Sequence, residues 1–281
     1  MMSIMFTQIF QIKKKLKPNI KRIKRLNFTK RQRFAAGVVI LSTSLFIIEY
    51  LLGKSGIVLV FLLAGLTDVF LFWAIYKDLR ENFAPHNFIL PFFYTLAFGL
   101  FYLLVPSRLL TRFFITTLYA FGLYSIFLSQ NIFTVSSIRT IALLSGARTV
   151  AFVIVLLVYF FLTNVVFSLH LNIILTLILL FVISFSLILY SIWTYTLEKN
   201  ITRFLSWGFL LSLCILEVTM ILWFWPSTPT IIALFLTGFF YIIVGLSHLW
   251  LEKRLFKSVM FEYVWVAAFV LIFLVVFTSW T

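Results

Sequence analysis

The residues best suited to chemistry are two carboxylic acids deep inside apolar segments, Asp68 and Glu217. They are the only acids far from the ends of the predicted membrane-spanning helices. At 1.5 Å per residue their predicted depths differ by about 6 Å, so contact across the bundle is geometrically allowed. A mid-membrane acid costs roughly 2.5–3.5 kcal/mol on insertion scales. A proton relay or substrate site is therefore one interpretation, and a hydrogen bond to a neighbouring Ser, Thr or Tyr is the other.

A second polar group, Glu49, Arg108 and Arg112, is predicted at the outer rim of the membrane. Two arginines near an acid are able to hold a phosphate or a lipid headgroup. The same residues also fit a plain interfacial ion pair, which is common and contributes under about 1 kcal/mol. We favour the plain ion pair.

Signatures of soluble enzyme chemistry are missing from the sequence. It contains no HExxH pair, Walker loop, GxSxG elbow or GxGxxG turn. The histidines His86, His170 and His248 fall on different helix ends, so we predict neither a metal site nor a cofactor. The single cysteine, Cys214, excludes an internal disulfide and is expected to be a small buried residue of a span.

Composition identifies lipid as the main solvent of the chain. Of 281 residues, 63% are hydrophobic and 11% are charged, and the mean hydropathy is +1.12. A soluble domain carries about a quarter charged residues. We predict an all-α, polytopic integral membrane bundle of about nine transmembrane helices. The predicted spans are 34–52, 56–76, 87–105, 109–129, 149–169, 171–193, 204–225, 230–250 and 259–279.

The distribution of Lys and Arg predicts the orientation. Eleven of the 23 basic residues lie between Lys13 and Arg33, and with the N-terminus inside, 20 fall on the inner side and three on the outer side. This is the positive-inside pattern. It places the N-terminus inside and the C-terminus outside, and the predicted localisation is the plasma membrane of a bacterium.

Residues 1–33 are predicted to form a basic cytoplasmic arm ahead of the bundle, 34–281. Apolar residues recur along it at spacings of three and four, at Ile9, Ile12, Leu16, Ile20 and Ile23. This pattern is typical of an amphipathic helix at the membrane surface, although a disordered tail fits equally well. Phe28 is the only aromatic residue from Lys13 to Arg33, so base stacking has little to use. We therefore expect anionic lipid headgroups as the arm's partner and no nucleic acid.

The longest interior run that is not plainly a span is the central polar stretch, 129–149, which includes Arg139 and Arg148. Its mixed helical spacing fits a short interfacial helix, and it also fits a cytoplasmic linker. A loop that contacts a substrate is a third interpretation.

Small residues predict close helix contacts. Gly238 and Gly245 share a face of the eighth span, and Gly208 with Ser212 forms a small-xxx-small pair in the seventh.

The segment NIFTVSSIRTIALLSGARTVAF, residues 131–152, resembles a region in a family of uncharacterised multi-pass membrane proteins from bacteria with reduced genomes. The resemblance implies a multi-pass membrane fold without an assigned activity. Its motif is not chemically specific, so no functional residue is carried over.

Three functions remain open on the sequence. Short loops and a basic arm favour a non-catalytic membrane component with a membrane-protein partner, and two intramembrane acids favour a transporter. The alternative is a membrane-embedded enzyme acting on a lipid or lipid-linked substrate at the outer rim, which we rank last.

Overall fold

The computed structural model describes residues 29–51, 56–79, 85–105, 108–136, 142–198 and 202–278. All regular secondary structure in these ranges is helical, and nine of the helices are long and apolar enough to cross a membrane. The predicted all-α integral membrane bundle is therefore confirmed. The helices are α2 (Lys30–Leu51), α3 (Ile57–Leu79), the short η2 (Pro85–Phe88) leading into α4 (Ile89–Leu104), α5 (Leu109–Ser136), α6 (Leu144–Ser168), α7 (Ile173–Thr196), α8 (Thr202–Trp223), α9 (Pro229–Leu251) and α10 (Lys257–Val276).

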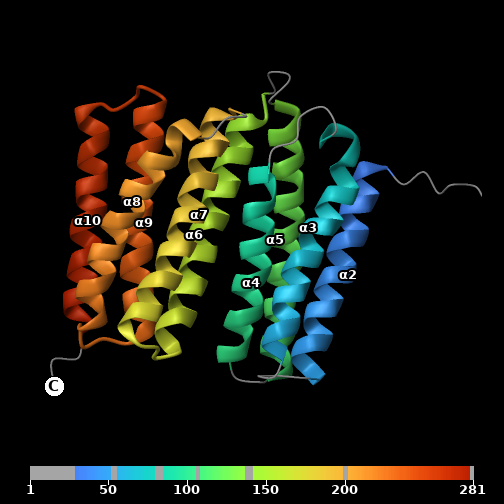
Figure 1. Ribbon diagram of the computed structural model, residues 1–281, viewed down its shortest axis with the longest axis horizontal. Helices are drawn as coiled ribbons and strands as arrows, with labels where there is room; N and C mark the ends of the chain where they lie inside the picture. The colour runs from blue at the N-terminus through green and yellow to red at the C-terminus, as the bar shows by residue number, and fades with distance from the viewer. Residues whose placement is uncertain are drawn as a thin grey trace, which may run out of the picture.

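Successive helices run in opposite directions and form two groups, α2–α5 and α6–α10 (Figure 1). In the first group α2 packs on α3 and α5, and α3 packs on α4. In the second, α8 packs on α7 and α9, and α10 packs on α9. The groups are joined by α6, which packs on α4 and α5 as well as on α7 and α9.

Buried aromatic side chains fill the contacts between helices. Tyr94 of α4 stacks on Tyr119 of α5 with 5.5 Å between ring centroids, and Phe101 stacks on Phe161 of α6 at 4.1 Å. The Tyr94 hydroxyl donates to the backbone oxygen of Tyr119 at 3.1 Å, which satisfies a polar group that lipid would not.

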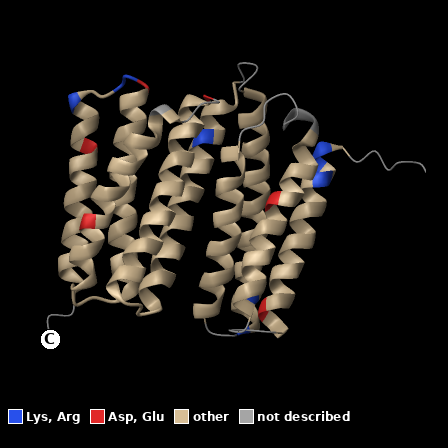
Figure 2. Cartoon of the chain, in the orientation of Figure 1, with Lys and Arg blue, Asp and Glu red and all other residues tan. Residues whose placement is uncertain are grey.

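Lys and Arg residues are unequally divided between the two ends of the bundle (Figure 2). We call the end where α2 begins the basic end, and the other the opposite end. Arg108 and Arg112, at the start of α5, lie at the opposite end. The other described Lys and Arg side chains lie at the basic end: Lys30, Arg31, Arg33, Arg148, Lys253, Arg254 and Lys257.

The first membrane helix begins four residues earlier than predicted, at Lys30 instead of Phe34. The Gln32 side chain accepts from the Thr29 backbone N–H at 3.0 Å, and the Gln32 N–H donates to the Thr29 hydroxyl at 3.4 Å. This reciprocal capping box satisfies two backbone donors and fixes the start of α2. Residues 1–28 of the predicted arm lie outside the described residues.

The central polar stretch, 129–149, is not a separate segment where the structure describes it. α5 continues to Ser136 and α6 begins at Leu144. The polar side chains that resembled a loop are buried between helices. The Gln130 amide donates to the Tyr190 hydroxyl at 2.7 Å, and the Asn87 amide donates to Thr134 at 3.1 Å. Because these groups are paired, the helix continues where hydropathy alone predicted its end; Arg139 lies outside the described residues.

The predicted close contacts at glycine are confirmed. A Cβ on Gly238 would lie 2.7 Å from Val270 of α10, and one on Gly208 would lie 2.8 Å from Leu189 of α7. The expectation that Cys214 is buried is wrong, because its side chain is exposed. α8 turns Gly208 and Ser212 toward its neighbours and leaves Cys214 on the outward side.

Candidate functional site

Four polar side chains from α2, α4 and α5 gather at the opposite end of the bundle: Glu49, Tyr102, Arg112 and Thr116. Glu49 and Tyr102 lie within electrostatic reach of Arg112, and Tyr102 lies beside Thr116. Each side chain has a buried polar atom without a hydrogen-bond partner outside the group: Glu49 Oε1, Arg112 Nε, and the hydroxyls of Tyr102 and Thr116, which can pair only with each other. Such atoms are rare in native proteins, and a cluster of them indicates a site for water or another bound group. We call it the rim cluster.

The antiparallel packing of α2 and α5 creates the rim cluster. Glu49 lies in the last turn of α2 and Arg112 in the first turn of α5, so the two residues meet although 63 positions separate them. Glu49 is only 3% exposed. The Arg112 guanidinium also lies over the Tyr50 ring, 5.5 Å from its centroid. Of the predicted outer-rim set, Glu49 and Arg112 therefore come together, while the Arg108 side chain is exposed.

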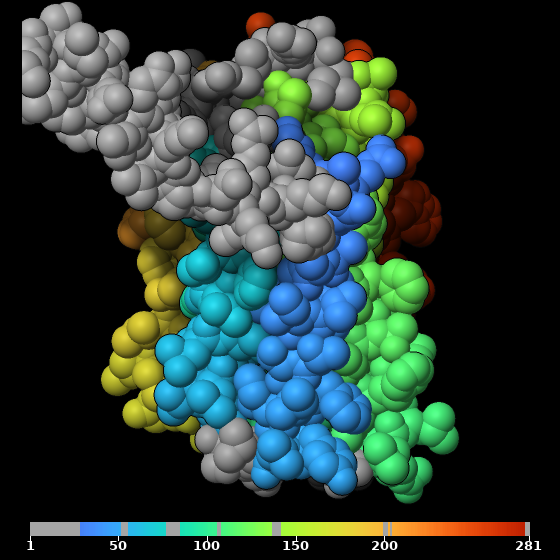
Figure 3. Space-filling view, turned by 90° about the vertical axis from the view of Figure 1, so that its right-hand side faces the viewer, coloured from blue at the N-terminus to red at the C-terminus, as the bar shows by residue number. Residues whose placement is uncertain are grey.

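A groove with a volume of about 600 Å³ runs between α2 and α5 next to the rim cluster. Phe46 of α2 and Phe113 and Phe121 of α5 line it, and Thr116 belongs to both the groove and the cluster. Figure 3 shows this face of the bundle, with α2 between α3 and α5. Away from Thr116, the groove's hydroxyls bond to their own helix: Thr43, for example, donates to the Val39 backbone oxygen at 2.8 Å. The groove is therefore effectively apolar.

Asp68 lies half-buried near the middle of α3, and its Oδ1 is buried without a hydrogen-bond partner. The preceding residue, Thr67, begins a chain of buried hydroxyls. Thr67 bonds to Thr95 at 3.0 Å, and Thr95 bonds to the Tyr119 hydroxyl at 3.1 Å. This chain joins α3, α4 and α5, but no described hydrogen bond connects it to Asp68.

Glu217 does not approach Asp68. α3 packs on α2, α4 and α5, whereas α8 packs on α7 and α9, so the two acids lie in different helix groups (Figure 1). The Glu217 side chain is exposed on the outward face of α8. The structure therefore does not produce the shared acid site that their similar depths allowed.

Arg148 has a structural role at the basic end. Its Nε donates to the Thr194 backbone oxygen at 3.0 Å and its Nη2 to that of Tyr195 at 2.7 Å. Its Nη1 lies 3.8 Å from Glu252 Oε1, just beyond α9. A cavity of about 760 Å³ opens beside this contact, lined in part by Tyr195, Glu252 and Trp207.

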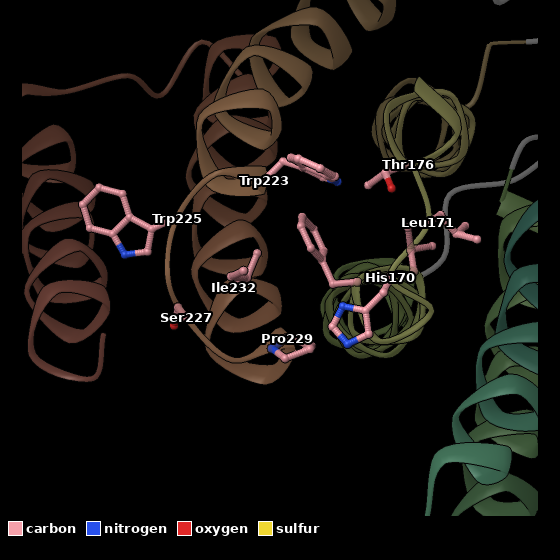
Figure 4. A pocket seen from close by; sticks show the side chains of 10 residues that line it. His170, Leu171, Thr176, Trp223, Trp225, Ser227, Pro229 and Ile232 are labelled. Atoms are coloured by element: carbon pink, nitrogen blue, oxygen red, sulfur yellow. The ribbon is translucent and has the colours of Figure 1, made fainter. Parts of the chain in front are cut away.

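A smaller cavity of about 280 Å³ lies at the opposite end among α6, α7, α8 and α9. Figure 4 shows the Trp223 side chain extending toward Thr176, with His170 in the turn between α6 and α7. His170 has φ 47°, which confirms the tight turn expected there. Ser227 Oγ, in the lining, is buried without a hydrogen-bond partner. The cavity has one such atom, against four in the rim cluster.

Comparison with protein families gives one match, over residues 38–277, to the family described as "Protein of unknown function (DUF5656)". The chain belongs to this family. No curated protein and no solved structure matches it. The family match covers eight membrane helices in full and α2 from Val38 onward, and it agrees with the resemblance to a family without assigned activity.

Sequence reasoning missed two members of the rim cluster, Tyr102 and Thr116. A signal for Thr116 was present, because it follows Arg112 by four residues and shares its helix face. Tyr102 had no comparable signal, since an interfacial tyrosine is ordinary in a membrane helix. Its role depends on α4 ending beside α2 and α5.

Proposed function

We propose that this protein is a non-catalytic membrane component that binds one phospholipid at the opposite end of the bundle. The headgroup occupies the rim cluster and one acyl chain lies in the groove between α2 and α5. The observation that carries the proposal is the convergence of four buried polar atoms, without a hydrogen-bond partner outside the rim cluster, beside an apolar groove open to the membrane.

The chemistry of the rim cluster specifies the headgroup. The Arg112 guanidinium matches a phosphate, and the hydroxyls of Tyr102 and Thr116 are further donors. Glu49 is an acceptor beside them. A phosphate linked to an amine or hydroxyl, as in phosphatidylethanolamine or phosphatidylglycerol, offers an anion to Arg112 and a hydrogen-bond donor to Glu49. Phosphatidylcholine has no donor for Glu49.

The groove supports a lipid over a water-soluble phosphate. Its lining runs from Phe113 to Phe121 on α5, about 12 Å along the helix axis, and so extends from the rim toward the middle of the membrane. An acyl chain attached to a headgroup at Arg112 would follow this path. With the basic end in the cytoplasm, the bound lipid belongs to the outer leaflet.

Two intramembrane acids favoured the transporter hypothesis, but Asp68 and Glu217 lie in different helix groups, so a site shared by both does not support it. The enzyme hypothesis requires a catalytic group at the rim in addition to a binding site. Glu49 is fully engaged in the proposed headgroup contact, so binding without chemistry is the simpler function.

The test is lipid binding by the purified full chain, measured by native mass spectrometry with three phospholipids of identical acyl chains. We expect phosphatidylethanolamine and phosphatidylglycerol to bind more tightly than phosphatidylcholine. Arg112→Gln removes charge-assisted bonds worth about 1.5–3 kcal/mol, so affinity for all three lipids should fall by roughly tenfold or more. Glu49→Gln should remove the preference and leave phosphatidylcholine binding unchanged.

Arg108→Gln is the matched control, because this exposed arginine lies one turn before Arg112 and should not affect binding. Thermal unfolding of each variant separates lost binding from misfolding. The proposal would be refuted if the folded wild type bound all three lipids with the same affinity and the folded Arg112→Gln variant bound them as tightly as the wild type. Efficient competition by glycerophosphoethanolamine, which lacks acyl chains, would instead indicate a soluble phosphate ligand.

A further inference from the structure

Glu217 lies on a face of α8 that is directed away from the rest of the bundle. The exposed residues Leu210, Leu213, Met220 and Ile221 surround it along this face, at helical spacings of three and four. Glu217 is 15 residues from the start of α8 and six from its end. These intervals place it about 22 Å and 9 Å from the two ends, inside the hydrocarbon region.

The inward face of α8 makes its contacts without this acid. Ser212 and Thr219 are fully buried on that face, and each hydroxyl donates to a backbone oxygen of its own helix, at 2.7 and 2.8 Å. Gly208 meets Leu189 of α7. The packing of α8 on α7 and α9 therefore leaves Glu217 free to engage something outside this chain.

Exposure of hydrophobic residues in a membrane helix needs no explanation, because lipid covers them. An exposed carboxyl does, because lipid tails offer it neither hydrogen bonds nor a counter-charge. The other acids whose side chains are described differ: Glu49 and Asp68 are turned into the bundle, while Glu198, Glu252 and Glu262 lie near the basic end. Among the described acids, Glu217 is the exposed one that lies deepest in its helix, six residues from the nearer end, while Glu262 is exposed five residues from the start of α10.

Charge complementarity identifies the occupant of this face. A basic side chain at the same depth would neutralise the carboxyl, and such a side chain is stable in a membrane only as part of another transmembrane helix. A second copy of this chain is a poor source. Its described Lys and Arg side chains lie in the first two turns of their helices or outside them, near the membrane surfaces.

We propose that the outward face of α8, centred on Glu217, binds a transmembrane helix of another protein through an ion pair with a Lys, Arg or His in that helix. Cys214, one turn from Glu217 on the exposed side, is a small residue that allows the partner helix to approach closely. The ion pair fixes both the depth and the rotation of the partner.

The test is site-specific photo-crosslinking of the full chain in its native membranes. p-Benzoylphenylalanine replaces Leu213 on the proposed face or, as a control, Val153 on the exposed side of α6. We expect a discrete protein adduct from position 213 only. Peptide mapping should place its attachment within one helical turn of a Lys, Arg or His in a transmembrane segment.

Variants at Glu217 distinguish this contact from non-specific crosslinking. Glu217→Leu should reduce the adduct at least tenfold without lowering thermal stability, because leucine is favourable in lipid. Glu217→Asp should retain part of it, and Arg112→Gln, which affects only the rim cluster, should leave it unchanged. The proposal fails if the adduct forms only with lipid or with a second copy of this chain. It also fails if the mapped segment lacks a basic residue or if Glu217→Leu has no effect.

Discussion

At the scale of single residues, Arg148 shows how one cation joins three helices. It lies in the second turn of α6, bonds to two carbonyl oxygens at the end of α7 and contacts Glu252 after α9. Those carbonyls carry the partial negative charge of a helix C-terminus, where a cation is stabilising. The guanidinium also lies over the Tyr195 ring, 4.9 Å from its centroid. Several weak interactions therefore converge on a side chain that is only 20% exposed.

We expect Arg148→Gln to lower the free energy of unfolding by about 2 kcal/mol, because it leaves two carbonyl oxygens without their donor and removes one of the two arginines beside Glu252. Unfolding in detergent by a denaturant titration measures this change. Arg254→Gln is the control: Arg254 lies 3.6 Å from the same Glu252 but is 72% exposed, so its loss should cost less than about 1 kcal/mol. Equal effects of the two substitutions would contradict the assigned role of Arg148.

At the scale of elements, the contact between α9 and α10 depends on the absence of side chains at two positions. Gly238 faces Val270, and Gly245 faces Tyr263, whose Oη would lie 2.5 Å from an added Cβ. α10 packs on α9 and is otherwise mostly exposed. Helices in lipid associate largely through close van der Waals packing, so these glycines determine how near α10 approaches.

Gly238→Ala should therefore weaken the attachment of α10. Overpacking typically costs 1–3 kcal/mol, and replacing glycine in a helix returns about 1 kcal/mol, so we expect a net loss of about 1 kcal/mol in unfolding experiments. Gly65→Ala is the matched control in α3, because an added Cβ there meets no atom within 4 Å, and it should be neutral or stabilising. Adding Val270→Ala to Gly238→Ala should restore part of the loss. Identical effects of the two glycine substitutions would show that helix propensity, and not packing against α10, determines the change in stability.

At the scale of the whole molecule, the charge difference between the two ends is the feature that defines its placement in the membrane. The basic end carries seven described Lys and Arg side chains and the opposite end two. Between the two ends, the described part of the chain has nine helices that are long and apolar enough to cross the membrane. The positive-inside rule predicts that the basic end faces the cytoplasm.

Reporter fusions test this orientation. Fusions after Asn82, Ser137, Lys199 and Lys257 should report the cytoplasm, and fusions after Ser55, Ser107, Ser227 and Thr281 should report the other side. Consistent inversion at all eight sites would reverse the orientation, which would move the rim cluster to the inner leaflet. Discordance at two or more sites would contradict nine crossings.

The sequence by itself determined the number of spans and the unequal charge of the two ends. Both are local properties, because a window of about 20 apolar residues is sufficient to cross a bilayer and charged residues are costly within it. The ends of the helices were harder to predict from the sequence. Gln130 and Thr134 resembled a linker, because their hydrogen-bond partners on α7 and in η2 are known only from the structure.

Only the tertiary structure decided which way each polar residue faces. In a soluble protein an apolar stripe marks the buried side of a helix, but in lipid every face is apolar and this signal is lost. Helical spacing relates the residues of α8 to one another without giving the rotation of α8 against α7 and α9. In the structure Gly208 packs against Leu189 and Ser212 and Thr219 are buried, and this rotation turns Glu217 outward. In the same way, the packing of α2 on α5 brings Glu49 and Arg112 together across 63 positions of sequence.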